Sequence, residues 1–406
     1  MTRTTATAPV RSAALQSDIE SIGRGLARSF TAVIDSLPTD ARRPQSLAKM
    51  LGVNVVLTSR LLKALRTGNG LTVAYFFPGP EPLRRVLRAA ERRRVPAKYL
   101  QAAESSVERF QHLIDEILGG RAGLDALLSA WLPEAREQAE LIAKQSVFRG
   151  MAQIKGHASD HEHCACLIHP SPDGRYLDRL SIMASLGLRR LRPNVPLSWN
   201  INCATPGVLA HSLDRDPDQG VSGAVLVEYC SRPAPSFTVA QSGPRVRYAL
   251  DETGVGPKTS VDLVFAEVRR RALHREFVEG ADHLVWAALT ADLPTKRLVM
   301  DLLMHEDVFP SARPELRVYD CATRRGLKPT EPVQPDHLMN TRESLASVGT
   351  GTEGLACAGF NRYTECAREV CAQLGWDIER FRVFRADIAY PVMGSEVVIQ
   401  FDRPDA

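Results

Sequence analysis

The chain has 406 residues, of which 44% are apolar and 24% are charged, a composition typical of a globular protein with two or three domains. No apolar run is long enough to cross a bilayer, so we expect no membrane-spanning segment and no membrane partner. Residues 1–110 hold 18 Lys or Arg against 8 Asp or Glu, and the remaining residues hold 33 against 39. This basic first part favours a polyanionic partner, although arginine-rich helices are also well solvated on their own.

The N-terminal residues and the cysteines bear on the cellular compartment. Residues 1–12 are rich in Thr and Ala and lack an apolar stretch with a cleavage site, which predicts a disordered tail and not a signal peptide. Eight cysteines lie between Cys164 and Cys371. Without an export signal they are expected to be reduced thiols and not a disulfide framework. We therefore predict a cytoplasmic protein.

The first part of the chain is predicted to be mostly helical. Small and apolar residues recur at helical spacing over residues 13–34, and Pro38 ends the pattern. The aromatic and β-branched run 71–77 predicts a strand, which Pro78-Gly79-Pro80 would end. Further helices are expected from Pro82, over 103–118 before Gly119-Gly120, at 124–131 and at 133–155.

Beyond Gly156 the chain is predicted to be rich in strands. Short β-prone runs lie at 164–168, 197–202, 224–229, 245–250, 261–268, 284–289, 298–304, 316–319, 381–390 and 396–401. Only two helices are expected among them, at 177–186 and 361–374. Because strands outnumber helices, we predict an α+β fold with a mostly antiparallel sheet.

The most specific pattern lies in Pro44–Arg66, which reads PQSLAKMLGVNVVLTSRLLKALR. Gly52 permits the positive φ of a tight turn between two short helices, and Asn54 is a favourable N-cap for the second helix. Apolar residues at helical spacing would pack the two helices together. These packing positions are Leu47, Ala48, Leu51, Val53, Leu57, Leu61 and Leu65.

This segment resembles the helix-turn-helix of bacterial transcriptional regulators, over about residues 41–80. The resemblance implies that the second helix enters the major groove of double-stranded DNA. Arg60 would then contact guanine, and Ser59 and Lys63 would contact phosphates. A strand at 71–77 would form the wing of a winged helix-turn-helix. The DNA-binding residues implied by the resemblance are Asn54, Val55, Val56, Ser59, Arg60, Lys63 and Arg66.

Two features depart from the pattern of these regulators. Val55 and Val56 stand where such regulators usually place polar side chains, so they would contact thymine methyl groups or pack against another part of this protein. Only one wing strand is recognisable, and it lacks a basic tip. The alternative is therefore a helix-turn-helix that serves as a protein-interaction or tethering module on an enzyme or assembly domain.

Histidines and cysteines cluster between His157 and His169. In a strand at 164–168, Cys164 and Cys166 would point to the same face, and imidazole and thiolate are ligands that zinc prefers. The predicted metal ligands are His161, His163, Cys164 and Cys166. No second Cys/His pair lies at a zinc-finger spacing, so buried thiols beside a polar loop are the alternative.

The polar run 304–307, Met-His-Glu-Asp, follows a predicted strand and would suit either a catalytic group or a polar strand end. Nothing in the sequence shows other groups converging on it, so we assign no catalytic residue.

The sequence thus predicts a tail (1–12), a helix-turn-helix domain (13–96), a helical connector (97–155) and a β-rich domain (156–406). Residues 326–354 would form a long loop or divide the β-rich domain. The expected function is sequence-specific transcriptional regulation, in which the C-terminal domain senses a small-molecule or protein effector. The resemblance to bacterial regulators further implies that the chain could act as a homodimer.

Overall fold

The computed structural model describes residues 8–202, 213, 221–251, 254–276, 284–321 and 337–402. The chain divides into two compact units, unit 1 (residues 1–142) and unit 2 (residues 143–406). Helix α1 begins at Ala8, so residues 8–12 of the predicted tail are helical, and residues 1–7 lie outside the described part. In the part of the chain that the structure describes, no helix combines the length and the apolar character that crossing a bilayer requires.

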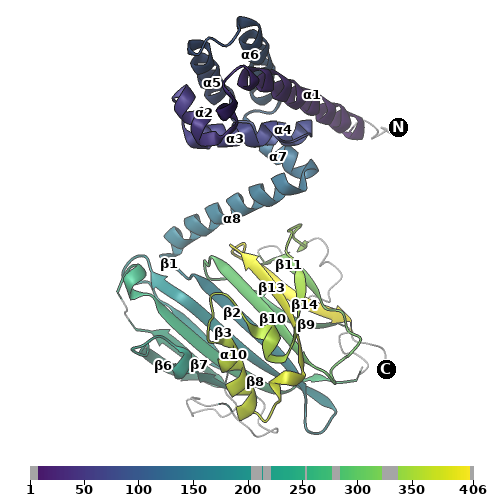
Figure 1. The fold of residues 1–406 in the computed structure, drawn as a ribbon. Helices are drawn as coiled ribbons and strands as arrows, with labels where there is room; N and C mark the ends of the chain where they lie inside the picture. The colour runs from purple at the N-terminus through teal and green to yellow at the C-terminus, as the bar shows by residue number, and fades with distance from the viewer. Residues whose placement is uncertain are drawn as a thin grey trace, which may run out of the picture. The chain divides into compact units, whose positions relative to one another are not determined.

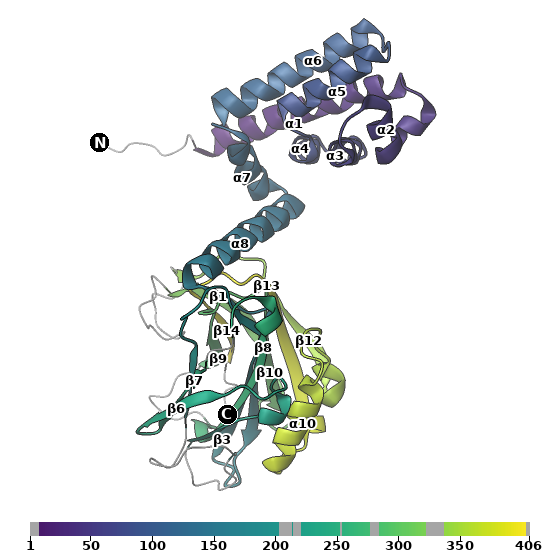
Figure 2. The ribbon, with the colours of Figure 1, turned by 90° about the vertical axis from the view of Figure 1, so that its left-hand side faces the viewer.

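Unit 1 is built from helices around one apolar core (Figures 1 and 2). The helices are α1 (Ala8–Asp35), α2 (Pro44–Leu51), α3 (Val55–Leu65), α4 (Gly70–Phe76), α5 (Pro80–Arg92), α6 (Ala97–His112) and α7 (Arg121–Trp131). A short 3-10 helix (Thr39–Arg42) precedes α2, and a π-helix (Leu113–Ile117) continues α6. Helices α6 and α7, which the sequence assigned to a separate connector, contribute Val107, Phe110 and Leu128 to the same core as the helix-turn-helix. The next helix, α8 (Pro133–Lys155), contains the division between the units.

The predicted wing strand at 71–77 is wrong, because residues 71–76 belong to helix α4. The side chain of Asn69 caps this helix by accepting hydrogen bonds from the backbone N–H groups of Leu71 and Thr72. Helix α4 packs closely against α1 through two glycines. A Cβ atom on Gly23 would lie 1.9 Å from the carbonyl oxygen of Gly70, so the aromatic and β-branched run is held as a helix by tertiary packing.

Unit 2 contains the strands. They are β1 (His157–Ala158), β2 (His161–Pro170), β3 (Tyr176–Arg190), β4 (Ser198–Asn202), β5 (Val221–Val225), β6 (Phe237–Ser242), β7 (Arg245–Leu250), β8 (Val261–His274), β9 (Leu284–Thr290), β10 (Arg297–His305), β11 (Glu315–Asp320), β12 (Leu345–Thr350), β13 (Phe381–Ala389) and β14 (Ser395–Asp402). Short 3-10 helices lie at Val227–Tyr229, Pro257–Thr259, Gly351–Leu355 and Ile378–Arg380, and helix α10 spans Tyr363–Gln373. The predicted α+β class, with a helical first part and a β-rich second part, is confirmed.

The described residues of this unit form three sheets. The central sheet has the strand order β12-β13-β10-β2-β3-β8-β5, and β1 pairs with β3. Strands β2 and β10 pair in parallel, and the other pairs among the named strands are antiparallel. The two smaller sheets have the orders β11-β14-β9 and β4-β7-β6.

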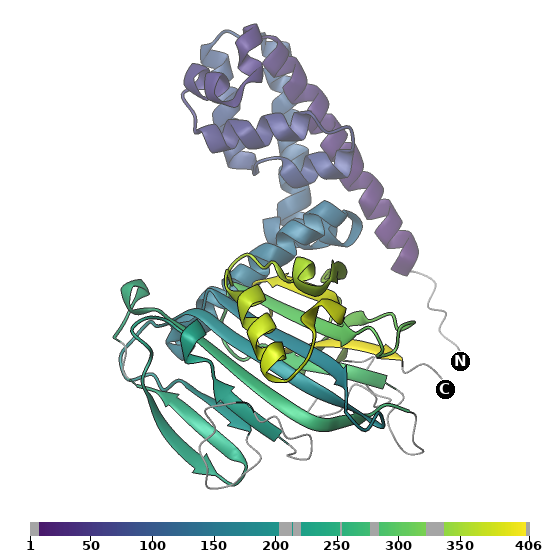
Figure 3. The same cartoon turned by 60° about the horizontal axis from the view of Figure 1, so that its bottom comes forward.

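The central sheet is covered on both faces, and Figure 3 shows α10 lying across one of them. On one face, Leu167 and Val383 pack with Tyr363 and Val370 of α10. On the other face, one apolar cluster joins the sheet to β9 and β14, and another joins it to β4 and β7. The parallel pairing of β2 and β10 in the middle of this sheet places their polar side chains side by side under the segment that leads into α10.

Two further predictions in unit 2 are wrong. Residues 177–186, predicted as a helix, belong to β3, a central strand with buried side chains on both faces and hence no alternating pattern in its sequence. The predicted loop 326–354 contains strand β12 and most of a 3-10 helix (Gly351–Leu355). Residues 322–336 lie outside the described part.

Candidate functional site

Helices α2 and α3 are joined by a short turn. Gly52 ends α2 with a φ of 65° and donates its backbone N–H to the carbonyl oxygen of Ala48. Asn54 then starts α3, because its side chain accepts a hydrogen bond of 2.7 Å from the N–H of Val56. Both residues therefore have the local roles that the sequence predicted for them.

Buried contacts hold the two helices together. Leu47 of α2 and Leu61 of α3 are fully buried in the core of unit 1. Thr58 is also fully buried, and its hydroxyl donates a hydrogen bond of 2.8 Å to the carbonyl oxygen of Pro44 at the start of α2. The orientation of α3 is thus fixed from its inner face.

The outer face of α3 carries most of the residues that the resemblance implied for DNA binding. The side chains of Val55 and Val56 are 46% and 65% exposed, which is unusual for large apolar side chains. Ser59, Arg60, Lys63 and Arg66 are exposed as well. Two of these side chains already have partners: the Lys63 Nζ atom lies 3.9 Å from the ring centroid of Phe76, and Arg66 donates to the carbonyl oxygen of Arg42 at 3.3 Å.

A hollow of about 490 Å³ lies beside the start of α3. Val56 and Arg60 line it on one side, and Arg85 and the segment 78–82 line it on the other. Residues 42–98, which contain this region, hold 13 Lys or Arg and only 2 Asp or Glu. Such a local excess of positive charge attracts an anionic partner.

A second candidate site lies in unit 2, on strand β2. His161 and His163 project from the face that α10 covers, and they are only 3% and 2% exposed. Cys164 and Cys166 project from the opposite face, and Cys166 lies in the apolar cluster shared with β9 and β14. Burial raises the pKa of Cys164 to about 12, because a thiolate is poorly solvated there. The structure thus brings together two of the four predicted metal ligands.

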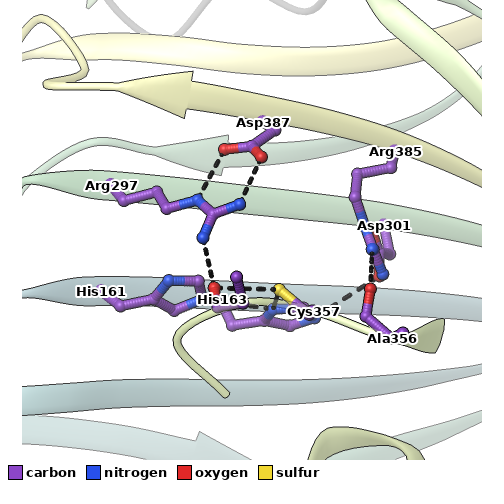
Figure 4. Close-up of polar contacts among 9 residues, drawn as sticks. His161, His163, Arg297, Asp301, Ala356, Cys357, Arg385 and Asp387 are labelled. Carbon is purple, nitrogen blue, oxygen red and sulfur yellow. Dashed lines mark hydrogen bonds and ion pairs between the residues drawn. The ribbon is translucent and has the colours of Figure 1, made fainter. Parts of the chain in front are cut away.

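The third member of this cluster is Cys357, which lies between β12 and α10 in the sequence (Figure 4). The Nε2 atom of His161 lies 3.5 Å from the Nδ1 atom of His163, and the Sγ atom of Cys357 lies 3.8 Å from that same Nδ1 atom. One ligand atom from each residue lies within 4.8 Å of the other two. We call these three residues the histidine–cysteine cluster.

Two arginines of the sheet hold Cys357 over the histidines. Arg385 of β13 donates a hydrogen bond of 2.6 Å to the carbonyl oxygen of Ala356, and Arg297 of β10 donates to that of Ala358 (Figure 4). The carbonyl groups on either side of Cys357 are therefore both bound to guanidinium groups.

The residues after Cys357 fit closely around the two imidazoles. Gly359 has a φ of 101°, and a Cβ atom there would lie 2.7 Å from the Nδ1 atom of His161. The aromatic rings of Phe360 and Tyr363 pack against His163, with centroid distances of 5.7 and 4.2 Å. A larger residue at position 359 would therefore displace His161.

Asp301 lies behind His163. Its Oδ2 atom is 3.6 Å from the Nε2 atom of His163, on the side of the ring away from Cys357. The carboxylate is fully buried and accepts two hydrogen bonds of 2.7 Å from Arg385. This buried ion pair anchors the arginine that holds the loop, and its carboxylate faces the far nitrogen of His163 without a hydrogen bond to it.

The electrostatics of the cluster favour neutral side chains. Burial lowers the pKa of His161 to about 4 and lowers that of His163 well below its usual range. Burial also raises the pKa of Cys357, although Arg385 opposes this effect. Neutral imidazoles at physiological pH are the form that coordinates metals.

The polar run at residues 304–307 is a strand end whose charges are paired. Arg380 donates to Glu306 at 2.6 Å and to Asp307 at 3.1 Å, and His305 is buried against the ring of Phe381. None of these residues belongs to the histidine–cysteine cluster.

Sequence reasoning missed Cys357 because it is 194 residues away from His163 in the chain and lies between the predicted loop 326–354 and the predicted helix 361–374. The strand alternation that placed Cys164 and Cys166 on one face also places His161 and His163 together on the other face. The alternation was thus the signal in the sequence that could have separated the histidine pair from the cysteine pair.

Comparisons with known proteins do not identify a family. No protein-family model matches the chain, and no curated protein matches it. Among solved structures, the chain is similar to a putative protease from Parabacteroides distasonis, with 8% sequence identity and a TM-score of 0.30. The match covers 61% of this chain and 41% of that one. A likeness at this level carries no functional inference.

Proposed function

We propose that the chain is a sequence-specific DNA-binding regulator in which α3 enters the major groove of double-stranded DNA. The observation that carries this proposal is the exposure of Val55 and Val56 beside Arg60 on the outer face of α3. A helix fixed by its inner face, with apolar and cationic side chains on its outer face, can read thymine methyl groups and guanine edges.

The surroundings of α3 support the same proposal. Arg60 and Arg85 line the hollow beside its N-terminus, and within the described part of the chain neither is paired with a carboxylate. A cationic surface of this kind neutralises phosphates and releases their counterions, which supplies most of the affinity of a DNA-binding protein. Unit 2 would then respond to a small-molecule or protein effector.

The absence of a wing strand at 71–77 changes the geometry that we propose. Since these residues form α4, minor-groove contacts by a wing at this place are not part of the proposal. Base reading rests on α3 alone, and we propose that a homodimer provides the second half-site.

The test is binding of the full-length chain to a pool of random duplexes over a series of salt concentrations. The pair of substitutions Arg60→Ala and Lys63→Ala should remove sequence selection and lower the salt dependence by about one ion for each phosphate that is no longer neutralised. The matched control is Arg24→Ala with Arg28→Ala, which removes the same charge from exposed positions on α1.

Equal loss of binding in the two double variants would show that only net charge matters. If the wild type selects no sequence but Val56→Asp abolishes capture of a protein partner, α3 is a protein-interaction helix. Either result would overturn the proposed function.

A further inference from the structure

We propose that the histidine–cysteine cluster is a zinc site, with His161 Nε2, His163 Nδ1 and Cys357 Sγ as protein ligands and the fourth position open to water. The inference is independent of DNA binding by unit 1. The ligand set differs from the one that the sequence predicted. Cys357, which only the fold brings close to the histidines, takes the place of Cys164 and Cys166.

Two of the three distances between the donor atoms are close to those of a tetrahedral site. With typical zinc–nitrogen and zinc–sulfur bonds, two nitrogen ligands lie about 3.4 Å apart, and a nitrogen and a sulfur ligand lie about 3.6 Å apart. The corresponding distances here are 3.5 Å for the two imidazoles and 3.8 Å for His163 and Cys357. The third pair, His161 and Cys357, lies within 4.8 Å, so the thiol must approach His161 by up to about 1.2 Å for all three donors to bind one ion.

Hydrogen bonding alone does not account for the burial of two histidines at this place. His161 Nδ1 and His163 Nε2 are both buried and have no hydrogen-bond partner among the described residues. Burying polar groups without partners costs free energy, so a cluster of this composition requires compensation. Coordination of an ion by the other two nitrogens, His161 Nε2 and His163 Nδ1, would not give these atoms partners, but its free energy would offset the cost of burying them.

The surroundings have the features of a supporting shell. A carboxylate that faces the far nitrogen of a coordinated imidazole fixes its orientation and raises its basicity, and Asp301 has that position behind His163. Arg297 and Arg385 hold the backbone on both sides of Cys357. Among the described residues the cluster contains three protein ligands, which is the number found in zinc sites that keep a position for water.

The experiment uses the untagged full-length chain, incubated with excess zinc, freed of unbound ion and analysed for metal content. We expect one equivalent in the wild type and in Cys164→Ala, and less than a tenth of that in Cys357→Ala and in His163→Ala. Circular dichroism establishes that each variant is folded. Cobalt in place of zinc should give a thiolate charge-transfer band that is present in Cys164→Ala and absent in Cys357→Ala.

A second measurement on the wild type alone keeps the proposal testable if a variant does not fold. Alkylation of Cys357, followed by peptide mass spectrometry, should be at least about tenfold slower with zinc than without it. A folded wild type that retains no metal overturns the proposal, and so does metal retained by Cys357→Ala. Equal alkylation with and without zinc would instead leave Cys357 as a thiol hydrogen-bonded to His163.

Discussion

The outer face of α3 and the histidine–cysteine cluster are built in opposite ways. The outer side chains of α3 come from one short segment, face solvent and make few contacts, so replacing them should change the packing of unit 1 little. The cluster comes from β2 and the segment before α10, residues of β10 and β13 support it, and its histidines are buried. Function and stability can therefore be separated by mutation in α3, whereas in the cluster the same residues contribute to both.

The largest effect should follow from breaking the buried ion pair. Arg385→Ala leaves the carboxylate of Asp301 buried without its partner and should lower the free energy of unfolding of unit 2 by about 3–5 kcal/mol. Arg317→Ala, which breaks an exposed ion pair with Glu315, should cost no more than about 1 kcal/mol. Urea unfolding in a Trp131→Phe background checks this, because the remaining tryptophans all lie in unit 2.

An equal cost for the two arginines would show that the buried pair is solvated in the folded protein. Burial would then make no difference to the contribution of an ion pair to the stability of unit 2.

A smaller effect is expected in unit 1, where helices α1 and α4 touch through glycines. Gly23→Ala should destabilise unit 1 by about 1–3 kcal/mol, because the added methyl group meets the backbone of Gly70. Gly25→Ala in the same helix has no neighbour within 4 Å and should stabilise the unit by about 0.5–1 kcal/mol. Helical circular dichroism during thermal unfolding measures both, and a shift of the same sign in the two variants would contradict the packing described here.

Substitution of Asp301, which is not a proposed ligand, should lower the affinity for zinc. Asp301→Asn should weaken zinc binding about 10- to 100-fold, because the amide orients His163 less strongly than the carboxylate does. The control is Asp178→Asn, since Asp178 also forms a buried ion pair, with Arg270, away from the cluster. Competition with a chelator gives the affinities. Equal values for the two variants would show that Asp301 has no positioning role.

The smallest change tests whether the orientation of α3 depends on its cap. Asn54→Ala removes the hydrogen bond to the N–H of Val56 and should cost unit 1 about 1 kcal/mol. DNA binding should weaken by a similar factor for all sequences, because Asn54 is occupied by the backbone. Loss of preference at one base pair would instead assign Asn54 to base recognition.

The same contrast explains how much of the molecule the sequence could predict. The turn at Gly52 and the cap at Asn54 are local devices, so their roles could be read from neighbouring residues. The strand β3 could not, since a strand buried on both faces has no alternation to recognise. The cluster was half predictable: alternation along β2 pairs His161 with His163, but only the sheet topology brings Cys357 to them.

Arg297 and Arg385 donate hydrogen bonds to the carbonyl groups beside Cys357, and this bears on when a metal ion could bind during folding. Arg297 and Arg385 lie on β10 and β13, and we expect these strands to pair before the segment around Cys357 can bind to them. His163 and Cys357 are also 194 residues apart in the chain. An ion therefore cannot nucleate unit 2 as it does a small zinc domain, where neighbouring ligands fold around the metal. It would enter a completed sheet, so that zinc should leave the refolding rate unchanged and slow the unfolding rate.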